Sequence, residues 1–179
     1  SSYSNRGVAK SELKDTVGAL NDFNKAIELN PLYAQAYAYR AEIKLNQNQV
    51  EGAIADCNTA LKIDPENASA YNYRGLANYQ LEKFTDAIQD FTMAVQYKPN
   101  DLNNYEFRGI AHYYAGNYDQ AINDFDFVIQ SNSSSANAML FKGLCLIGLR
   151  NFDLGCKSLQ MANALGLKEA QVEIAKYCN

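Results

Sequence analysis

Histidine and cysteine are the side chains that most often bind metals or act as nucleophiles, and this sequence has few of them. It has one histidine, His112, and four cysteines, no two of which are separated by the two residues common in zinc sites. It has no glycine-rich phosphate loop and no Ser or Cys in a strand-turn-helix nucleophile context. We therefore predict that the chain is not an enzyme and holds no metal or cofactor. His112, Cys57 and Cys145 are expected to be packed side chains.

Arginine and aspartate recur along the chain with one fixed step, which indicates a different kind of chemistry. In the last repetition Lys142 replaces the Arg and Ser158 replaces the Asp. Because both positions change together, we expect Arg and Asp to form ion pairs between helices, bidentate where geometry allows. The alternative is that the arginines bind an anionic ligand. The predicted pairs are Arg6 with Asp22, Arg40 with Asp56, Arg74 with Asp90, and Arg108 with Asp124.

The elements that position these charges repeat every 34 residues, with no insertion or deletion across five periods. Pro31, Pro65 and Pro99 keep this step. Small residues at one position let two helix backbones approach, and a bulky residue at another fills the space beside them. The small positions are Gly7, Ala41, Gly75, Gly109 and Gly143; the bulky ones are Phe23, Cys57, Phe91, Phe125 and Leu159; an aromatic series runs Tyr3, Tyr37, Tyr71, Tyr105 and then Met139.

This pattern resembles the tetratricopeptide repeat, whose 34-residue unit carries aromatic, small, Ala, aromatic and Pro positions in that order. The resemblance implies an all-α fold, a right-handed α-α superhelix (solenoid) of five helix-turn-helix repeats plus a C-terminal capping helix. We expect one domain over residues 1–179. The repeats should occupy about 1–33, 34–67, 68–101, 102–135 and 136–167, with the capping helix over 168–179.

The end of the chain suggests a cap that is covalently attached. The segment from Lys168 to Tyr177 is amphipathic, as the solvating end of a solenoid requires. If the preceding helix turns back at Gly166-Leu167, Cys156 and Cys178 lie equally far from the turn and face each other. We predict a disulfide between them, with two reduced packing thiols as the alternative. A disulfide requires an oxidising compartment such as a bacterial periplasm.

The last 25 residues or so resemble the C-terminal units of tetratricopeptide proteins common in the Bacteroidetes bacteria, which favours a bacterial source. The sequence leaves the compartment open between periplasm and cytoplasm. The chain starts at Ser1-Ser2-Tyr3, so we interpret it as a piece of a longer protein or a processed one.

Composition excludes several partners. With 47% hydrophobic and 20% charged residues the chain should fold. A net charge of −4, without clustered Lys and Arg, argues against nucleic acid. No apolar run approaches the roughly 18 residues that a membrane helix needs.

The resemblance also implies a concave groove lined by the first helix of each repeat. None of the side chains expected there is Lys or Arg, so the clamp that co-chaperones of the family use for acidic chaperone tails is absent. An aromatic and aliphatic patch flanked by glutamates should instead bind an apolar, neutral to basic segment; the alternative is that packing covers the patch. The predicted partner-binding residues are Glu42, Asn72, Leu76, Tyr79, Glu106, Ile110, Tyr113, Tyr114, Leu140 and Leu144.

We therefore predict a non-catalytic protein-protein interaction scaffold that binds a peptide or helix of a partner in this groove. The alternative is a docking or regulatory arm of a larger enzyme or envelope protein whose catalytic part lies outside this segment. Weak self-association is a third alternative.

Overall fold

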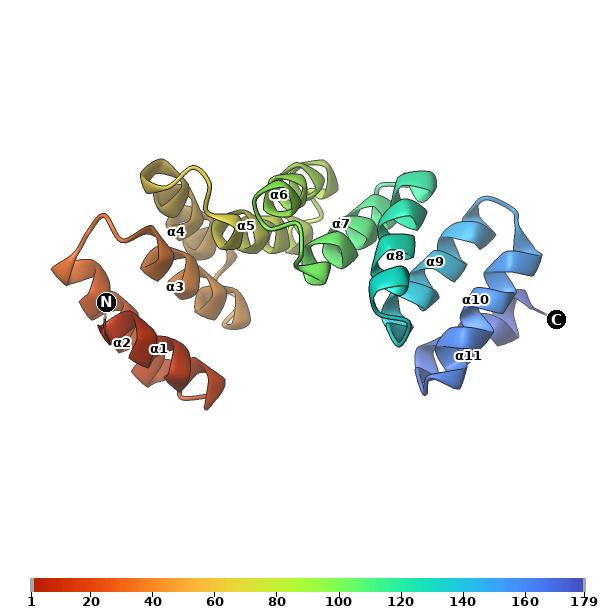
Figure 1. Ribbon diagram of the computed structural model, residues 1–179, viewed down its shortest axis with the longest axis horizontal. Coiled ribbons are helices and arrows are strands. Elements are labelled where there is room, and N and C mark those ends of the chain that lie inside the picture. The colour runs from red at the N-terminus through yellow and green to blue at the C-terminus, as the bar shows by residue number, and fades with distance from the viewer. Residues whose placement is uncertain (1, 179) are drawn as a thin grey trace. The chain divides into compact units, whose positions relative to one another are not determined.

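Eleven α-helices and no strand make up residues 2–178, the part of the chain that this computed structural model describes (Figure 1). Ser1 and Asn179, the first and last residues of the expected domain, lie outside it. The helices are α1 (Ser2–Glu12), α2 (Thr16–Leu29), α3 (Ala34–Asn46), α4 (Val50–Ile63), α5 (Ala68–Gln80), α6 (Phe84–Tyr97), α7 (Leu102–Tyr114), α8 (Tyr118–Ser131), α9 (Ala136–Gly148), α10 (Phe152–Ala164) and α11 (Lys168–Tyr177).

The chain divides into two compact units, residues 1–99 with α1–α6 and residues 100–179 with α7–α11. Each expected repeat contains two helices, so the first unit holds three repeats and the second holds two repeats and α11. The single domain expected over residues 1–179 stays a prediction.

Short turns join the two helices of each repeat, and each turn uses one residue with left-handed backbone. This residue has φ of 61° at Lys14, 59° at Asn48, 58° at Glu82, 78° at Gly116 and 65° at Arg150. The five positions keep the 34-residue step, so the turn is repeated with the rest of the unit. At the start of α5, Asn67 Oδ1 accepts a hydrogen bond from the Ala70 amide at 2.9 Å and so caps the helix.

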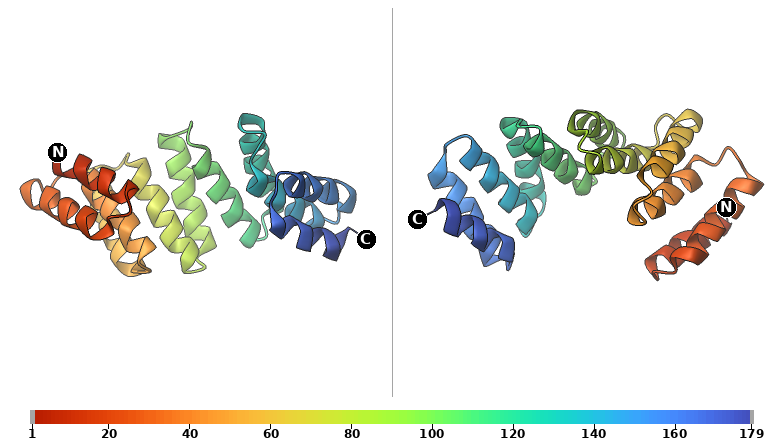
Figure 2. Two further views of the ribbon diagram at one scale, coloured as in Figure 1. Left: turned by 90° about the horizontal axis from the view of Figure 1, so that it is seen from below. Right: turned by 180° about the vertical axis from the view of Figure 1, so that it is seen from behind.

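In the first unit, the helices of each repeat lie side by side, and α2 and α4 also pack against the next repeat's first helix (Figures 1 and 2). A glycine on the first helix faces a buried phenylalanine on the second: a Cβ added at Gly75 would lie 2.8 Å from the Phe91 ring. In the middle repeat Ala41 and Cys57 take these places, and both are fully buried. Ala41 is larger than the glycine of the neighbouring repeats, and Cys57 is smaller than their phenylalanine, so the pair fills a similar space.

In the second unit, α7 pairs with α8 and α9 with α10, while α11 packs on α10. Cys156 of α10 and Cys178 after α11 are joined by a disulfide with an S–S distance of 2.04 Å. Ala170 of α11 is buried in a cluster with Met139, Leu159 and Ala162. The helix therefore covers apolar side chains of the last repeat, as a cap should.

The two remaining cysteines are free and buried, one in each unit. Burial raises the pKa of the Cys57 and Cys145 thiols to about 12, which keeps them protonated and unreactive at neutral pH.

Candidate functional site

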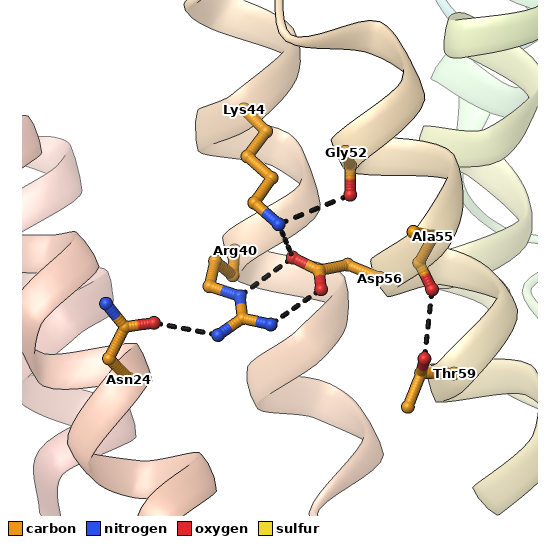
Figure 3. A network of polar contacts seen from close by, with 7 residues as sticks. All are labelled: Asn24, Arg40, Lys44, Gly52, Ala55, Asp56 and Thr59. Carbon is orange, nitrogen blue, oxygen red and sulfur yellow. Dashed lines mark hydrogen bonds and ion pairs between the residues drawn. The ribbon is translucent and has the colours of Figure 1, made fainter.

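The Arg-Asp series forms hydrogen-bonded ion pairs between the two helices of a repeat (Figure 3). Arg40 on α3 donates from Nε to Asp56 Oδ2 at 2.8 Å and from Nη2 to Oδ1 at 2.6 Å. Lys44, one turn further on, lies 2.7 Å from the same carboxylate. The third guanidinium nitrogen, Nη1, donates to Asn24 of the preceding repeat at 2.7 Å. The arginine thus connects two helices of its own repeat with the repeat before it.

The same pairing occurs in the first, third and fourth repeats, with the shortest N···O distance 2.6 Å in each. Each guanidinium also lies 5.1 to 5.5 Å from a tyrosine ring centre three residues earlier on its helix. All four aspartates are at most 5% exposed. Because each arginine already has a carboxylate, the series stabilises the repeats and leaves little charge for an anionic ligand. The pairs are Arg6–Asp22, Arg40–Asp56, Arg74–Asp90 and Arg108–Asp124.

Hydrogen bonds from Arg6 and then Lys10 hold the pKa of the Asp22 carboxyl well below its usual range. Lys10, Lys44 and Asn78 occupy one position of the repeat, and each contacts the aspartate of its own repeat. Sequence reasoning missed this second donor, although the 34-residue step could have shown it. His112 stands at the same position; burial lowers its pKa, and the charge of Asp124 partly opposes that shift.

The last repeat has a different ion pair from the other four. Lys142 Nζ donates to Asp126 of the preceding repeat at 2.5 Å, while the Ser158 hydroxyl donates to the Leu154 carbonyl on its own helix. Asp126 stands at the position of Asn24 and Asn58, the acceptors from the preceding repeat. The Arg-to-Lys change therefore exchanges the bond within the repeat for one between repeats.

The predicted partner-binding residues of the first unit lie on α3 and α5. Glu42, Asn72, Leu76 and Tyr79 are all partly buried. Leu76 packs against the core cluster of its unit, and the Tyr79 ring centre lies 5.8 Å from that of Phe84. These side chains therefore combine packing with an exposed edge.

In the second unit, the structure brings three of the predicted residues together on α7. The ring centre of Tyr113 lies 5.1 Å from Tyr114 and 5.5 Å from Phe141 of α9, and Ile110 packs against the same cluster. Tyr114 is 49% exposed. The Ser135 hydroxyl donates to Glu106 at 3.4 Å.

Leu140 and Leu144 differ from this group. Leu140 is only 8% exposed and belongs to the core cluster that includes Ala170 of α11, and Leu144 packs against that cluster. Leu140 is thus a core residue rather than an exposed groove residue, because the cap and the last repeat enclose it.

A cleft of about 440 Å³ opens on the first helices of the first unit. Of the predicted residues only Glu42 lines it. The sequence reasoning missed Tyr39 and Tyr73, which stand one period apart, because their orientation depends on how successive helices are rotated. The lining is Val8, Ser11, Glu12, Phe23, Tyr39, Glu42, Asn46 and Tyr73.

Within residues 2–178, no three His, Cys, Asp or Glu side chains are grouped to hold a metal ion. None of the helices in that range combines the length and apolar character of a membrane-crossing segment.

Paired helices of similar length, repeated with one internal turn and, in four of the five repeats, one internal ion pair, define an α-helical repeat protein. Five family models match the chain, at residues 1–31, 23–55, 41–82, 68–101 and 108–162, and each describes a TPR or tetratricopeptide repeat. The chain belongs to the tetratricopeptide repeat family, and the predicted all-α repeat fold is confirmed.

Similar proteins agree with this assignment. A tetratricopeptide repeat protein 36 homolog of Nematostella vectensis is 51% identical over 41 residues, a match that spans 23% of the length of each protein. Among solved structures, YrrB superposes with a TM-score of 0.81 at 22% identity, covering 97% of this chain and 90% of that one. MamA superposes with a TM-score of 0.79 at 21% identity, covering 92% and 96%. At such identities the likeness shows the fold alone.

Proposed function

We propose that the chain is a non-catalytic interaction scaffold that binds a peptide or helix of a partner protein on the face formed by its first helices. The observation that carries this proposal is that each unit keeps aromatic and aliphatic side chains of a first helix partly exposed, on α5 in the first unit and on α7 in the second. Tyrosine suits such a surface because its ring is apolar and its hydroxyl is polar. The residues are Leu76, Tyr79, Ile110, Tyr113 and Tyr114.

The structure of YrrB is described as that of a TPR protein with an unusual peptide-binding site. That description supports a peptide as the ligand class for a chain of the same fold. The groove positions include Glu42 and Glu106 and no Lys or Arg, so the partner segment is apolar and neutral to basic rather than an acidic chaperone tail.

We also propose a compartment on the basis of the cysteines. A disulfide such as that between Cys156 and Cys178 persists in an oxidising environment, which favours the periplasm over the cytoplasm for a bacterial protein. The bacterial source suggested by the last residues stays a prediction.

The test is affinity capture from the source organism with the whole chain and with the Tyr79→Ala, Tyr113→Ala double variant. We expect the double variant to lose the captured partner, because removing each partly exposed aromatic anchor should weaken binding by more than about 1 kcal/mol.

Val17→Ala and Val172→Ala serve together as the matched control, with one exposed apolar residue changed in each unit. They should leave capture unchanged. Equal capture by the tyrosine variant and the wild-type chain, both folded by circular dichroism, would refute binding through this face.

A further inference from the structure

One glutamate in the cleft of the first unit stands where the repeat otherwise has an apolar side chain. Glu42 occupies the position of Val8, Leu76, Ile110 and Leu144. Packing at this position thus requires only an apolar residue, and a partly buried carboxylate has a desolvation cost. A charge kept at such a cost is best explained by a ligand that it contacts.

Aromatic rings form the walls beside this carboxylate. Tyr39 stacks on Phe23 with ring centres 5.5 Å apart and planes inclined by 30°. Tyr73 comes from the next repeat and lines the same cleft as Glu42. Burial first, and then the charge of Glu42, raise the pKa of Tyr73.

The charge of the cleft is negative. Glu12 and Glu42 line it, and no Lys or Arg does. The lysines next to this face, Lys10 and Lys44, are held in ion pairs with Asp22 and Asp56 of the second helices. Among residues 2–178, none forms an ion pair with either glutamate. Aromatic faces and carboxylates together attract a cation, and they do so more strongly in a partly desolvated site.

From this combination of acidic and aromatic side chains, we infer that the cleft between α1, α3 and α5 binds a lysine or arginine side chain of the partner. The long methylene chain would lie along Tyr39 and Tyr73, and the charged end would meet Glu42 with Glu12 at the rim. This inference rests on the proposed function and names the ligand chemistry of one part of the same face.

The test is selection of a random-peptide phage library on the immobilised whole chain, followed by fluorescence anisotropy with the enriched peptides. We expect these peptides to carry Lys or Arg beside apolar residues. Changing that residue to Gln should weaken binding at least about tenfold, as expected for loss of one close charge pair. Glu42→Gln should weaken binding by a similar factor and should add little to the peptide change.

Two further variants make the result specific. Glu42→Leu introduces the residue type found at Leu76, so it should fold and still lose the preference for basic peptides. Glu66→Gln removes an exposed glutamate outside the cleft and should change nothing.

Enriched peptides that lack a basic residue, or that bind Glu42→Gln as tightly as the wild-type chain, would overturn this inference and leave peptide binding intact. A selection that yields no peptide binding to the folded chain would contradict the proposed function as well.

Discussion

A buried aspartate with two donors is the smallest repeated unit of this molecule. Asp90, for example, accepts from Arg74 at 2.6 Å and from Asn78 at 2.9 Å, with 5% of its surface exposed. Such a carboxylate is tolerated inside a protein only because donors replace its water. The arginines of this position therefore belong to the structure of the repeats.

Arg74→Met tests this role at the level of one residue. Removing the guanidinium leaves Asp90 buried with Asn78 as a remaining donor, and we expect a loss of about 3 kcal/mol in the free energy of unfolding. Urea titration followed by circular dichroism measures it. Lys62→Met, an exposed change on α4, should cost little. Unchanged stability in Arg74→Met, together with loss of an acidic partner, would favour the anionic-ligand alternative.

Asp22 makes the stability of the folded chain depend on pH. Its pKa is lowered in the folded state, so its stabilising contribution is complete above the unfolded pKa of about 3.9 and is lost as the pH falls below it. We expect the urea midpoint to fall on acidification below about pH 4. Asp22→Asn should lower the midpoint at neutral pH and flatten this fall. An identical acid profile in the variant would show that Asp22 contributes nothing to it.

Contact between the two helices of a repeat depends on one small and one bulky residue. A Cβ at Gly7, Gly75 or Gly109 would lie 2.8 Å from the facing phenylalanine ring, closer than carbon atoms pack. The second repeat keeps the same helix pair with Ala41 and Cys57.

Cys57→Phe should therefore destabilise the chain, by about 1–3 kcal/mol, because the new ring meets the Ala41 methyl group. Adding Ala41→Gly should recover most of that loss, since this pair exists in the neighbouring repeat as Gly75 and Phe91. The double-mutant cycle, with Ala41→Gly alone as the control, measures the coupling by urea unfolding. Additive effects would mean that the second repeat does not share the close packing of its neighbours.

The 34-residue step made the helix pairs, their turns and the Arg-Asp pairing predictable, because each follows from identical spacing in every repeat. The Lys142–Asp126 bond was missed because it joins neighbouring repeats, although Asn24, Asn58 and Asp126 share a position in the sequence. Leu140 was expected in the groove because the first helices of the family line it, and packing within the last repeat and against the cap buries it. Tyr39 and Tyr73 converge with Glu42 through the rotation of successive helices, which spacing alone does not give.

On the scale of the whole molecule, stability should be a sum of repeat and neighbour terms, so an end repeat depends on its cap. The second unit ends in α11, and the disulfide between Cys156 and Cys178 ties that helix to α10.

Replacing Cys156 and Cys178 with Ser should lower the free energy of unfolding by about 3 kcal/mol, from the loop of 22 residues that the bond closes. Urea unfolding of the oxidised chain and the variant measures the difference, and reductant should affect only the wild-type chain. Thiol titration after denaturation without reductant should find only Cys57 and Cys145 reactive. Titration of all four cysteines would contradict the bridge.

Binding of a partner segment to the first helices is tested most directly by mapping amide chemical shifts on addition of a selected peptide. We expect perturbed amides on first helices, with Tyr39, Glu42 and Tyr73 of the cleft among them. Perturbations confined to the second helices α2, α4, α6, α8 and α10 would contradict it.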